Sequence, residues 1–310
     1  MKTTVLTTAL LALALALALP LPAFSQQPSP PAANQASTPE LPRLLPDDLF
    51  RRNIGSPAQM DAQFPPHRMI GNLYHVGTES LASFLVTTDA GHILINTDFE
   101  RNVPTIKDSV EKLGFAFDDI AIILGSHEHA DHMEGDALAK QLSGAEVVVL
   151  EEQVPGLRAM RPGDKEHPMD RIIHDGDVVE LGGVRLTAHL TPGHTDGCTS
   201  WELDVTEAGQ SHKAVIICSL GVNPNYQLWN NPDRPDIVDQ YRQSYAILRA
   251  IPADVPLGSH PAMYKMNEKY PRLGSDPNPY IDPEGYLYEI ALNEQAMTLR
   301  LAEQREAAGE

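Results

Sequence analysis

One short stretch holds the residues best suited to chemistry: Ser126-His127-Glu128-His129-Ala130-Asp131-His132. Its three imidazoles and the carboxylate of Asp131 are donors that zinc accepts readily. The stretch directly follows an apolar run, 120–124, so we expect a tight loop at the end of a strand. Residues two apart on such a loop can face one metal ion, and the next pair can turn toward a second. Without a metal these polar groups would compete for few partners, so the stretch predicts a metal site.

Glu128 is the member of this stretch without a predicted ligand role. The local string is not His-Glu-x-x-His, because position 131 is Asp. The helical metalloprotease arrangement therefore does not apply. We expect Glu128 either to support the ligands or to lie in solvent.

The elements that must position these donors follow from the apolar pattern. Pro283 follows Asp282 at the start of the last helical pattern, a typical helix beginning. Strands and helices that alternate along one chain predict an α/β fold with layered, mixed sheets. Short apolar runs predict strands at 73–76, 82–86, 92–95, 120–124, 147–150, 184–190, 200–205 and 214–219, and helical patterns occupy 104–113, 136–142, 234–250 and 283–306.

The first 48 residues differ in composition from the rest. A positive Lys2, a Leu/Ala run and small residues before position 26 predict a secretory signal peptide, residues 1–25. A retained membrane anchor is the alternative, because the run is long enough to span a bilayer; its prolines and the small-residue site favour cleavage. Residues 26–48, rich in Pro, Ala, Gln and Ser, predict a flexible arm, and 49–310 a catalytic domain. We therefore expect a periplasmic or secreted protein without stable membrane association.

Composition narrows the class of partner. Hydrophobic residues make up 42% of the 310-residue chain, enough for a sizeable core. The formal net charge is −19, which makes nucleic acid and anionic membranes poor partners. The charge says little about a small substrate, because bound metal ions can reverse the local field.

The metal-binding stretch also carries a family resemblance. His127-x-His129-x-Asp131-His132 resembles the defining motif of the metallo-β-lactamase superfamily, and the stretches 191–195 (Thr-Pro-Gly-His-Thr) and 258–261 (Gly-Ser-His-Pro) agree with it. The resemblance runs from about residue 70 to the terminal helix. It implies an αββα sandwich, with two mixed sheets flanked by helices, and two Zn²⁺ per chain. The implied ligands are His127, His129 and His194 for the first zinc, and Asp131, His132 and His260 for the second.

Ser219 points to a subgroup of that superfamily. Its thioesterases and lactonases place a bridging Asp near this position, whereas a Ser with this second-zinc set looks like the third subclass of class B β-lactamases. Residues 221–228, 241–244 and 257–260 resemble that subclass as well. The resemblance implies a periplasmic β-lactamase that hydrolyses penicillins, cephalosporins and carbapenems by a metal-bound hydroxide, and we expect a monomer. Asp131 would orient that hydroxide, and Ser219 would hold a water at the second zinc.

The segment after Ser219 is expected to bind substrate. Many relatives use a second Ser, two residues later, for the β-lactam carboxylate, and Gly221 stands there in this chain. Asn223 or a backbone N–H is the expected substitute, so Ser219, Gly221 and Asn223 form the predicted substrate-binding set. Residues 151–168 are expected to form a loop over the site, in which Val154, Leu157 and Met160 pack a short helix rather than contact substrate.

The two cysteines, Cys198 and Cys218, leave three states open. If strands 201–205 and 214–219 form a hairpin with its turn centred on Ala208, the two residues lie opposite each other and can form a disulfide. Two free thiols are the first alternative. Zinc ligation by Cys218, which is adjacent to the ligand position, is the second.

Two other functions stay open. One is an exported hydrolase of the same superfamily that acts on another lactone, ester or cyclic amide; Ser219 in place of a bridging Asp argues against it. The other is a metal-binding scaffold without catalysis, against which the complete set of six ligands argues. Hydrolysis of β-lactams with and without a chelator, and zinc content measured beside turnover, distinguish the three.

Overall fold

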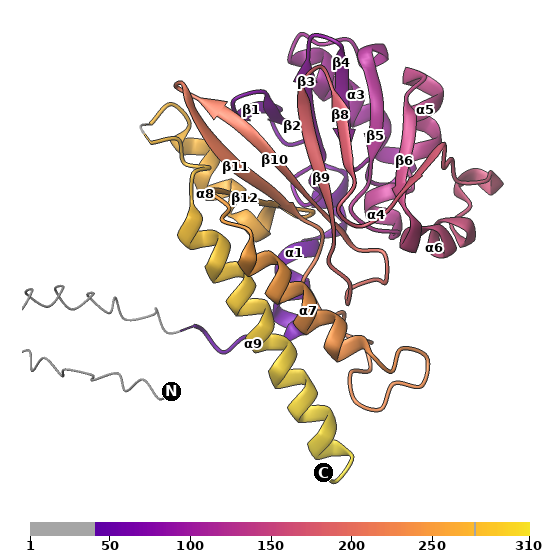
Figure 1. The fold of residues 1–310 in the computed structure, drawn as a ribbon, viewed down its shortest axis with the longest axis vertical. Helices are drawn as coiled ribbons and strands as arrows, with labels where there is room; N and C mark the ends of the chain where they lie inside the picture. Colours follow the sequence, from indigo (N-terminus) through magenta and orange to yellow (C-terminus); the bar gives the residue numbers. More distant parts are fainter. Residues whose placement is uncertain (1–40, 276) are drawn as a thin grey trace, which may run out of the picture. The chain divides into compact units, whose positions relative to one another are not determined.

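Two β-sheets lie face to face in the computed structural model, which describes residues 41–275 and 277–310 (Figure 1). The seven-stranded sheet has the order β1 (His67–Ile70), β2 (Leu73–His75), β3 (Phe84–Thr88), β4 (Gly91–Ile95), β5 (Ile120–Leu124), β6 (Glu146–Leu150), β7 (Arg171–Ile173). It is antiparallel from β1 to β4 and parallel from β4 to β7. The five-stranded sheet has the order β12 (Val255–Gly258), β11 (Gln210–Ile217), β10 (Thr199–Glu207), β9 (Val184–Leu190), β8 (Val178–Leu181), and only its β11–β12 pair is parallel.

Alternation along the central strands builds the layers. Ile93 and Ile122 face the other sheet, where they share one hydrophobic cluster with Trp201. Leu94 and Ile123, one residue along, belong to a second cluster on the opposite face. Because successive strand residues point to opposite faces, both faces of β4 and β5 are buried, which explains why these strands read as continuous apolar runs.

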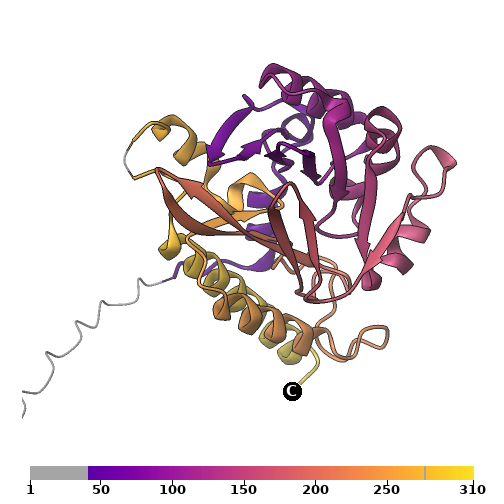
Figure 2. The same cartoon turned by 45° about the horizontal axis from the view of Figure 1, so that its top comes forward.

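Helices cover the outer faces of both sheets (Figure 2). Buried residues of α3 and α6 join the second cluster beside the seven-stranded sheet, and those of α7 and α9 join the cluster shared by the two sheets. The order of layers confirms the predicted α/β sandwich of two mixed sheets. The described helices are α1 (Pro46–Ile54), α2 (Pro57–Asp61), α3 (Val103–Lys112), α4 (Ala130–Met133), α5 (Asp136–Ser143), α6 (Val154–Ala159), α7 (Ile237–Ala250), α8 (Met266–Lys269) and α9 (Pro283–Ala307).

The predicted elements agree with the observed ones, apart from short pieces. Each predicted strand and helix is present, and Asp282 caps α9 by accepting a hydrogen bond from the Gly285 N–H. Four strands of three or four residues each were not predicted from the sequence: β1, β7, β8 and β12. Strand β12 contains both Pro256 and Gly258, residues that weaken the strand signal. Among the helices of the described ranges, none is long and apolar enough to cross a membrane.

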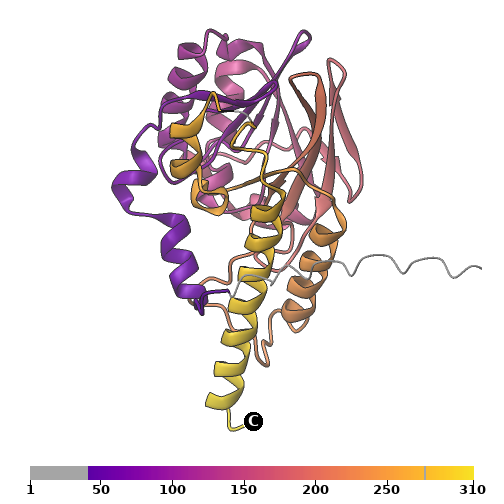
Figure 3. The ribbon, with the colours of Figure 1, turned by 90° about the vertical axis from the view of Figure 1, so that its left-hand side faces the viewer.

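The N-terminal segment differs from its prediction. Residues 1–40, which include the predicted signal peptide and most of the predicted arm, lie outside the described residues. Helix α1 begins at Pro46, three residues before the predicted start of the catalytic domain at 49. Figure 3 shows α1 beside α9, where Leu49 packs with Leu292 and Ala296. Residues 46–48, predicted as the end of the arm, are therefore the first residues of a helix that packs against α9.

Candidate metal centre

Strand ends bring the six predicted ligands to one place. His127 and His129 follow β5, Asp131 and His132 lie on α4, His194 lies between β9 and β10, and His260 follows β12. They form two groups whose nitrogen or carboxylate donor atoms lie within 4.8 Å of one another in each group. These groups are His127, His129 and His194, the first triad, and Asp131, His132 and His260, the second triad.

The first triad consists of three imidazoles. The ring centroid of His127 lies 4.7 Å from that of His129 and 4.6 Å from that of His194, with the rings steeply inclined to each other. The Nε2 atom of His127 is buried and has no hydrogen-bond partner among the described residues. An orphaned nitrogen amid two further imidazoles suits a zinc ion, which binds nitrogen at about 2.0–2.1 Å in tetrahedral geometry.

The second triad adds a carboxylate. Asp131 Oδ2 lies 3.3 Å from His132 Nε2 and 3.9 Å from His260 Nε2. The two triads adjoin each other, because the ring centroids of His127 and His132 are 4.3 Å apart. This donor set also fits zinc, so the residues can hold two metal ions side by side.

Hydrogen bonds fix the orientation of two ligands. His194 Nδ1 donates to the Gly221 carbonyl at 2.7 Å, and His260 Nδ1 donates to the Ser80 carbonyl at 3.0 Å. A carbonyl only accepts, so Nδ1 carries the hydrogen and Nε2 is left free for a metal. His127 differs, because its Nδ1 lies near Ser126 Oγ and the Cys218 sulfur, at 3.2 and 3.5 Å.

Burial sets the charges of the ligands. It lowers the pKa of His194 to about 3 and that of His260 to about 4, with further lowering by neighbouring histidines. Burial likewise holds the pKa of His127 well below its usual range. Burial alone would raise the pKa of Asp131, but the charge and hydrogen bond of His132 bring it below its ordinary value. Neutral imidazoles and an ionised carboxylate are the forms that bind metal.

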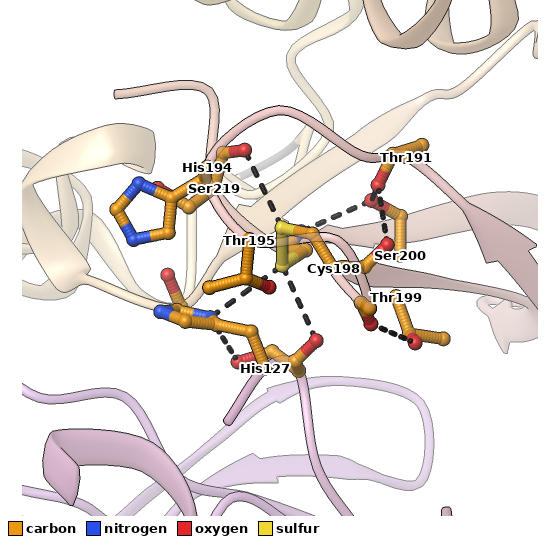
Figure 4. Close-up of a disulfide and its surroundings, with 12 residues drawn as sticks. His127, Thr191, His194, Thr195, Cys198, Thr199, Ser200 and Ser219 are labelled. Carbon is orange, nitrogen blue, oxygen red and sulfur yellow. Dashed lines mark hydrogen bonds between the residues drawn. A yellow bond between two sulfur atoms is a disulfide. The ribbon is translucent and has the colours of Figure 1, made fainter. Parts of the chain in front are cut away.

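A disulfide lies directly behind His127 (Figure 4). Cys198 and Cys218 are bonded to each other, with their Cα atoms 5.7 Å apart. Both sulfurs are used in that bond, so neither is a metal ligand here. The hairpin pairs Trp201 with Ile216, which centres its turn between Ala208 and Gly209 rather than on Ala208; the predicted register was wrong by half a residue. The disulfide consequently joins residues just outside the paired strands.

A cavity of about 240 Å³ opens above the two triads. The predicted substrate-binding residues Ser219, Gly221 and Asn223 form part of its wall, and Val154 and Leu157 of α6 pack in the second cluster as expected. Another part of the wall, the α1 wall, was not predicted from the sequence. It consists of Phe50, Asn53 and Ile54 of α1 together with Phe99.

Two buried polar residues after β4 were also missed. Asn96 Oδ1 accepts a hydrogen bond from the Ser126 N–H at 2.9 Å and so anchors the start of the ligand loop. Asp98 accepts one from Ser83 Oγ at 2.9 Å, and burial raises its pKa to about 7 against the opposing charge of His132. Both have positive φ angles, 63° and 56°. Asn and Asp adopt that conformation more readily than other non-glycine residues, a weak sequence signal for such a turn.

Comparison with known proteins identifies a family and solved structures that this chain resembles. Residues 40–207 match the family model described as the metallo-beta-lactamase superfamily. The FEZ-1 metallo-β-lactamase from Legionella gormanii is 42% identical with a TM-score of 0.76, over 79% of this chain and 98% of that one. BJP-1, a subclass B3 metallo-β-lactamase of Bradyrhizobium japonicum, is 35% identical with a TM-score of 0.75, over 81% and 98%. A hydroxyacylglutathione hydrolase of Brucella anthropi is 29% identical over a segment that makes up 33% of this chain and 35% of that protein. The chain therefore matches only about a third of the length of this curated relative.

Proposed function

The chain belongs to the metallo-β-lactamase superfamily, and from this premise we propose that it is a zinc-dependent hydrolase that opens the amide bond of β-lactams. The observation that carries the proposal is the pair of adjoining triads under one cavity, with Ser219 rather than an acidic residue at position 219 of the cavity wall. FEZ-1 and BJP-1, two solved structures that this chain matches over 98% of their length, are metallo-β-lactamases. Zinc bound at such triads supplies a nucleophile at neutral pH and polarises the scissile carbonyl.

Asp131 is the catalytic residue that we assign to proton handling. It is the one carboxylate among the six predicted ligands, and the charge of His132 favours its ionised form. Its side chain lines the cavity above the two triads. An ionised carboxylate there can orient the attacking group and accept its proton, provided it lies within hydrogen-bond reach.

The remaining cavity residues are assigned to substrate binding. Ser219 presents a hydroxyl, to which the Gly221 N–H donates at 3.4 Å. A Cβ atom at Gly221 would meet only Ser219 Oγ, at 3.7 Å, so the glycine widens the cavity at this point. Asn223 would then bind the β-lactam carboxylate, while Phe50 and Ile54 of α1 contact apolar substituents. The extra space at Gly221 agrees with a substrate range that includes penicillins, cephalosporins and carbapenems.

Export to the periplasm is part of the same proposal. Its support is the composition of residues 1–25 and the disulfide Cys198–Cys218, since disulfides persist in oxidising compartments. The second candidate function is hydrolysis of a thioester, ester or lactone, which the partial match to hydroxyacylglutathione hydrolase favours.

A substrate panel tests the proposal. Purified protein is assayed against a penicillin, a cephalosporin, a carbapenem and a glutathione thioester, with zinc content measured on the same sample. We expect two zinc ions per chain and β-lactam turnover that a chelator abolishes and added zinc restores. Thioester turnover without β-lactam turnover would favour the second candidate, and two bound zinc ions without any turnover would leave a metal-binding scaffold.

A further inference from the structure

Glu128 links the two loops that carry the first triad. It lies between His127 and His129, yet it does not line the cavity. Instead its Oε2 atom accepts a hydrogen bond of 2.9 Å from the hydroxyl of Thr195, the residue that follows His194. Thr195 is buried, with 7% of its surface exposed. One side-chain contact therefore ties His194 to the loop of the other two ligands.

Helix α6 packs against the Glu128 side chain as well. A Cβ atom at Gly156 would lie 2.3 Å from Cγ of Glu128 and 3.1 Å from its Cβ. Contacts that close do not occur, so only glycine leaves room for the Glu128 side chain here. The glycine is otherwise unfavourable, since Gly in a helix costs about 1 kcal/mol relative to Ala. Glu128 is thus held between α6 and Thr195.

The turn that precedes α6 contacts both ligand loops as well. A Cβ atom at Gly197 would lie 2.5 Å from the backbone N of Gln153. The Gln153 side chain donates from Nε2 to the Ser126 carbonyl at 3.2 Å. The segment 151–159 therefore forms a common support for the loop before His127 and the loop after His194.

We propose that Glu128 is a positioning residue, which together with Thr195 and Gly156 forms a clamp that fixes His194 against His127 and His129. This clamp sets the zinc affinity of the first triad. The inference rests on the zinc site of the proposed function but not on the identity of the substrate. Its physical basis is preorganisation: three neutral ligands from two loops bind tightly only if the loops are held together before the metal arrives.

Other contacts limit the expected loss. His194 is also held by the Gly221 carbonyl, and its own carbonyl accepts from the Tyr226 hydroxyl at 2.7 Å. Loss of the clamp should therefore loosen the triad without unfolding the loop. Substitution of residues that support metal ligands typically lowers affinity about 10- to 100-fold, and we expect the low end of that range.

Matched substitutions at Thr195 isolate the hydroxyl. T195V keeps the branched shape but removes the donor, whereas T195S keeps the donor. Zinc affinity is measured on the full folded chain by competition with a chromophoric chelator, which does not depend on turnover. We expect T195V and E128A to weaken the binding of one zinc about 10-fold, and T195S and E128Q, which retains an acceptor oxygen, to bind almost as the wild type does. Equal affinity of T195V and wild type would overturn the proposal, and so would a metal-free T195V that no longer folds.

Gly156 offers an independent perturbation remote from the metal. G156A forces the Glu128 side chain aside, so it should weaken zinc binding although Ala is the better helix former. In the E128A background the obstruction is gone, and G156A should then change zinc affinity little. Additive effects of G156A and E128A would contradict the clamp. Wild-type protein that binds two zinc ions but cleaves no β-lactam would refute the proposed function and leave the clamp standing.

Discussion

Acidification should destabilise the folded chain through His75, a histidine in strand β2. The residue is fully buried, and neither ring nitrogen has a hydrogen-bond partner within the described part of the chain. The aromatic rings of Phe64 and Phe84 lie 5.7 and 6.5 Å from its own ring. Burial, and then the neighbouring His67, lower the pKa of His75 from 6.5 to about 3. The folded state therefore keeps His75 neutral at a pH where the unfolded chain takes up a proton.

The sign and size of the effect follow from this difference in pKa. The contribution of His75 to the free energy of unfolding is fully present above pH 6.5 and falls as the pH drops toward 3. Each pH unit within that window costs about 1.4 kcal/mol. Between pH 7 and pH 5, His75 alone should therefore remove about 2 kcal/mol, a large share of the roughly 5–15 kcal/mol that stabilises a typical domain.

Urea unfolding of metal-free wild type and H75F, each at pH 7 and pH 5, measures this share. Phe keeps an aromatic ring among the neighbouring aromatic rings and removes the titrating group. The other histidines titrate in both proteins, so their contributions cancel when the two pH-dependent losses are subtracted. We expect H75F to lose about 2 kcal/mol less than wild type, while H174Q, a change at an exposed histidine, behaves as wild type. Equal losses for wild type and H75F would refute the reasoning.

Three further variants test the site and its support. R52A removes the ion-pair partner of Glu289, which is 4% exposed. It should lower the free energy of unfolding by about 3 kcal/mol and raise KM for β-lactams, because α1 would pack less firmly. An unchanged KM would show that α1 does not contribute to substrate binding. The double change C198S/C218S opens a crosslink across 20 positions and should cost about 3 kcal/mol in urea unfolding; undiminished stability would contradict it. D131N should lower kcat at least 100-fold and weaken zinc binding in chelator competition, and near-normal kcat with full zinc would exclude Asp131 from proton handling.

Local and long-range features differed in how far the sequence could predict them. The spacing of His127, His129 and Asp131 is a local pattern, and the apolar run of β5 predicts the strand that presents it. An ion pair between Arg52 and Glu289, 237 positions apart, joins α1 to α9, and no local sequence pattern predicts a contact over that separation. The Glu128–Thr195 contact joins positions 67 apart. The hairpin register depended on a two-residue turn at Ala208 and Gly209, both with positive φ, a detail that apolar pattern alone does not give.

The two triads differ in what determines their affinity for metal. The first triad consists of imidazoles whose pKa burial lowers, so its affinity for metal should depend on geometry. The Glu128–Thr195 contact and the segment 151–159 join its two loops. The second triad contains Asp131, whose negative charge attracts a cation even when its position is less well fixed. Substitutions that shift position should therefore act mainly on the first triad, and substitutions that remove charge on the second. We therefore expect the number of bound metal ions to distinguish the two kinds of change, whereas the rate of hydrolysis should fall in both.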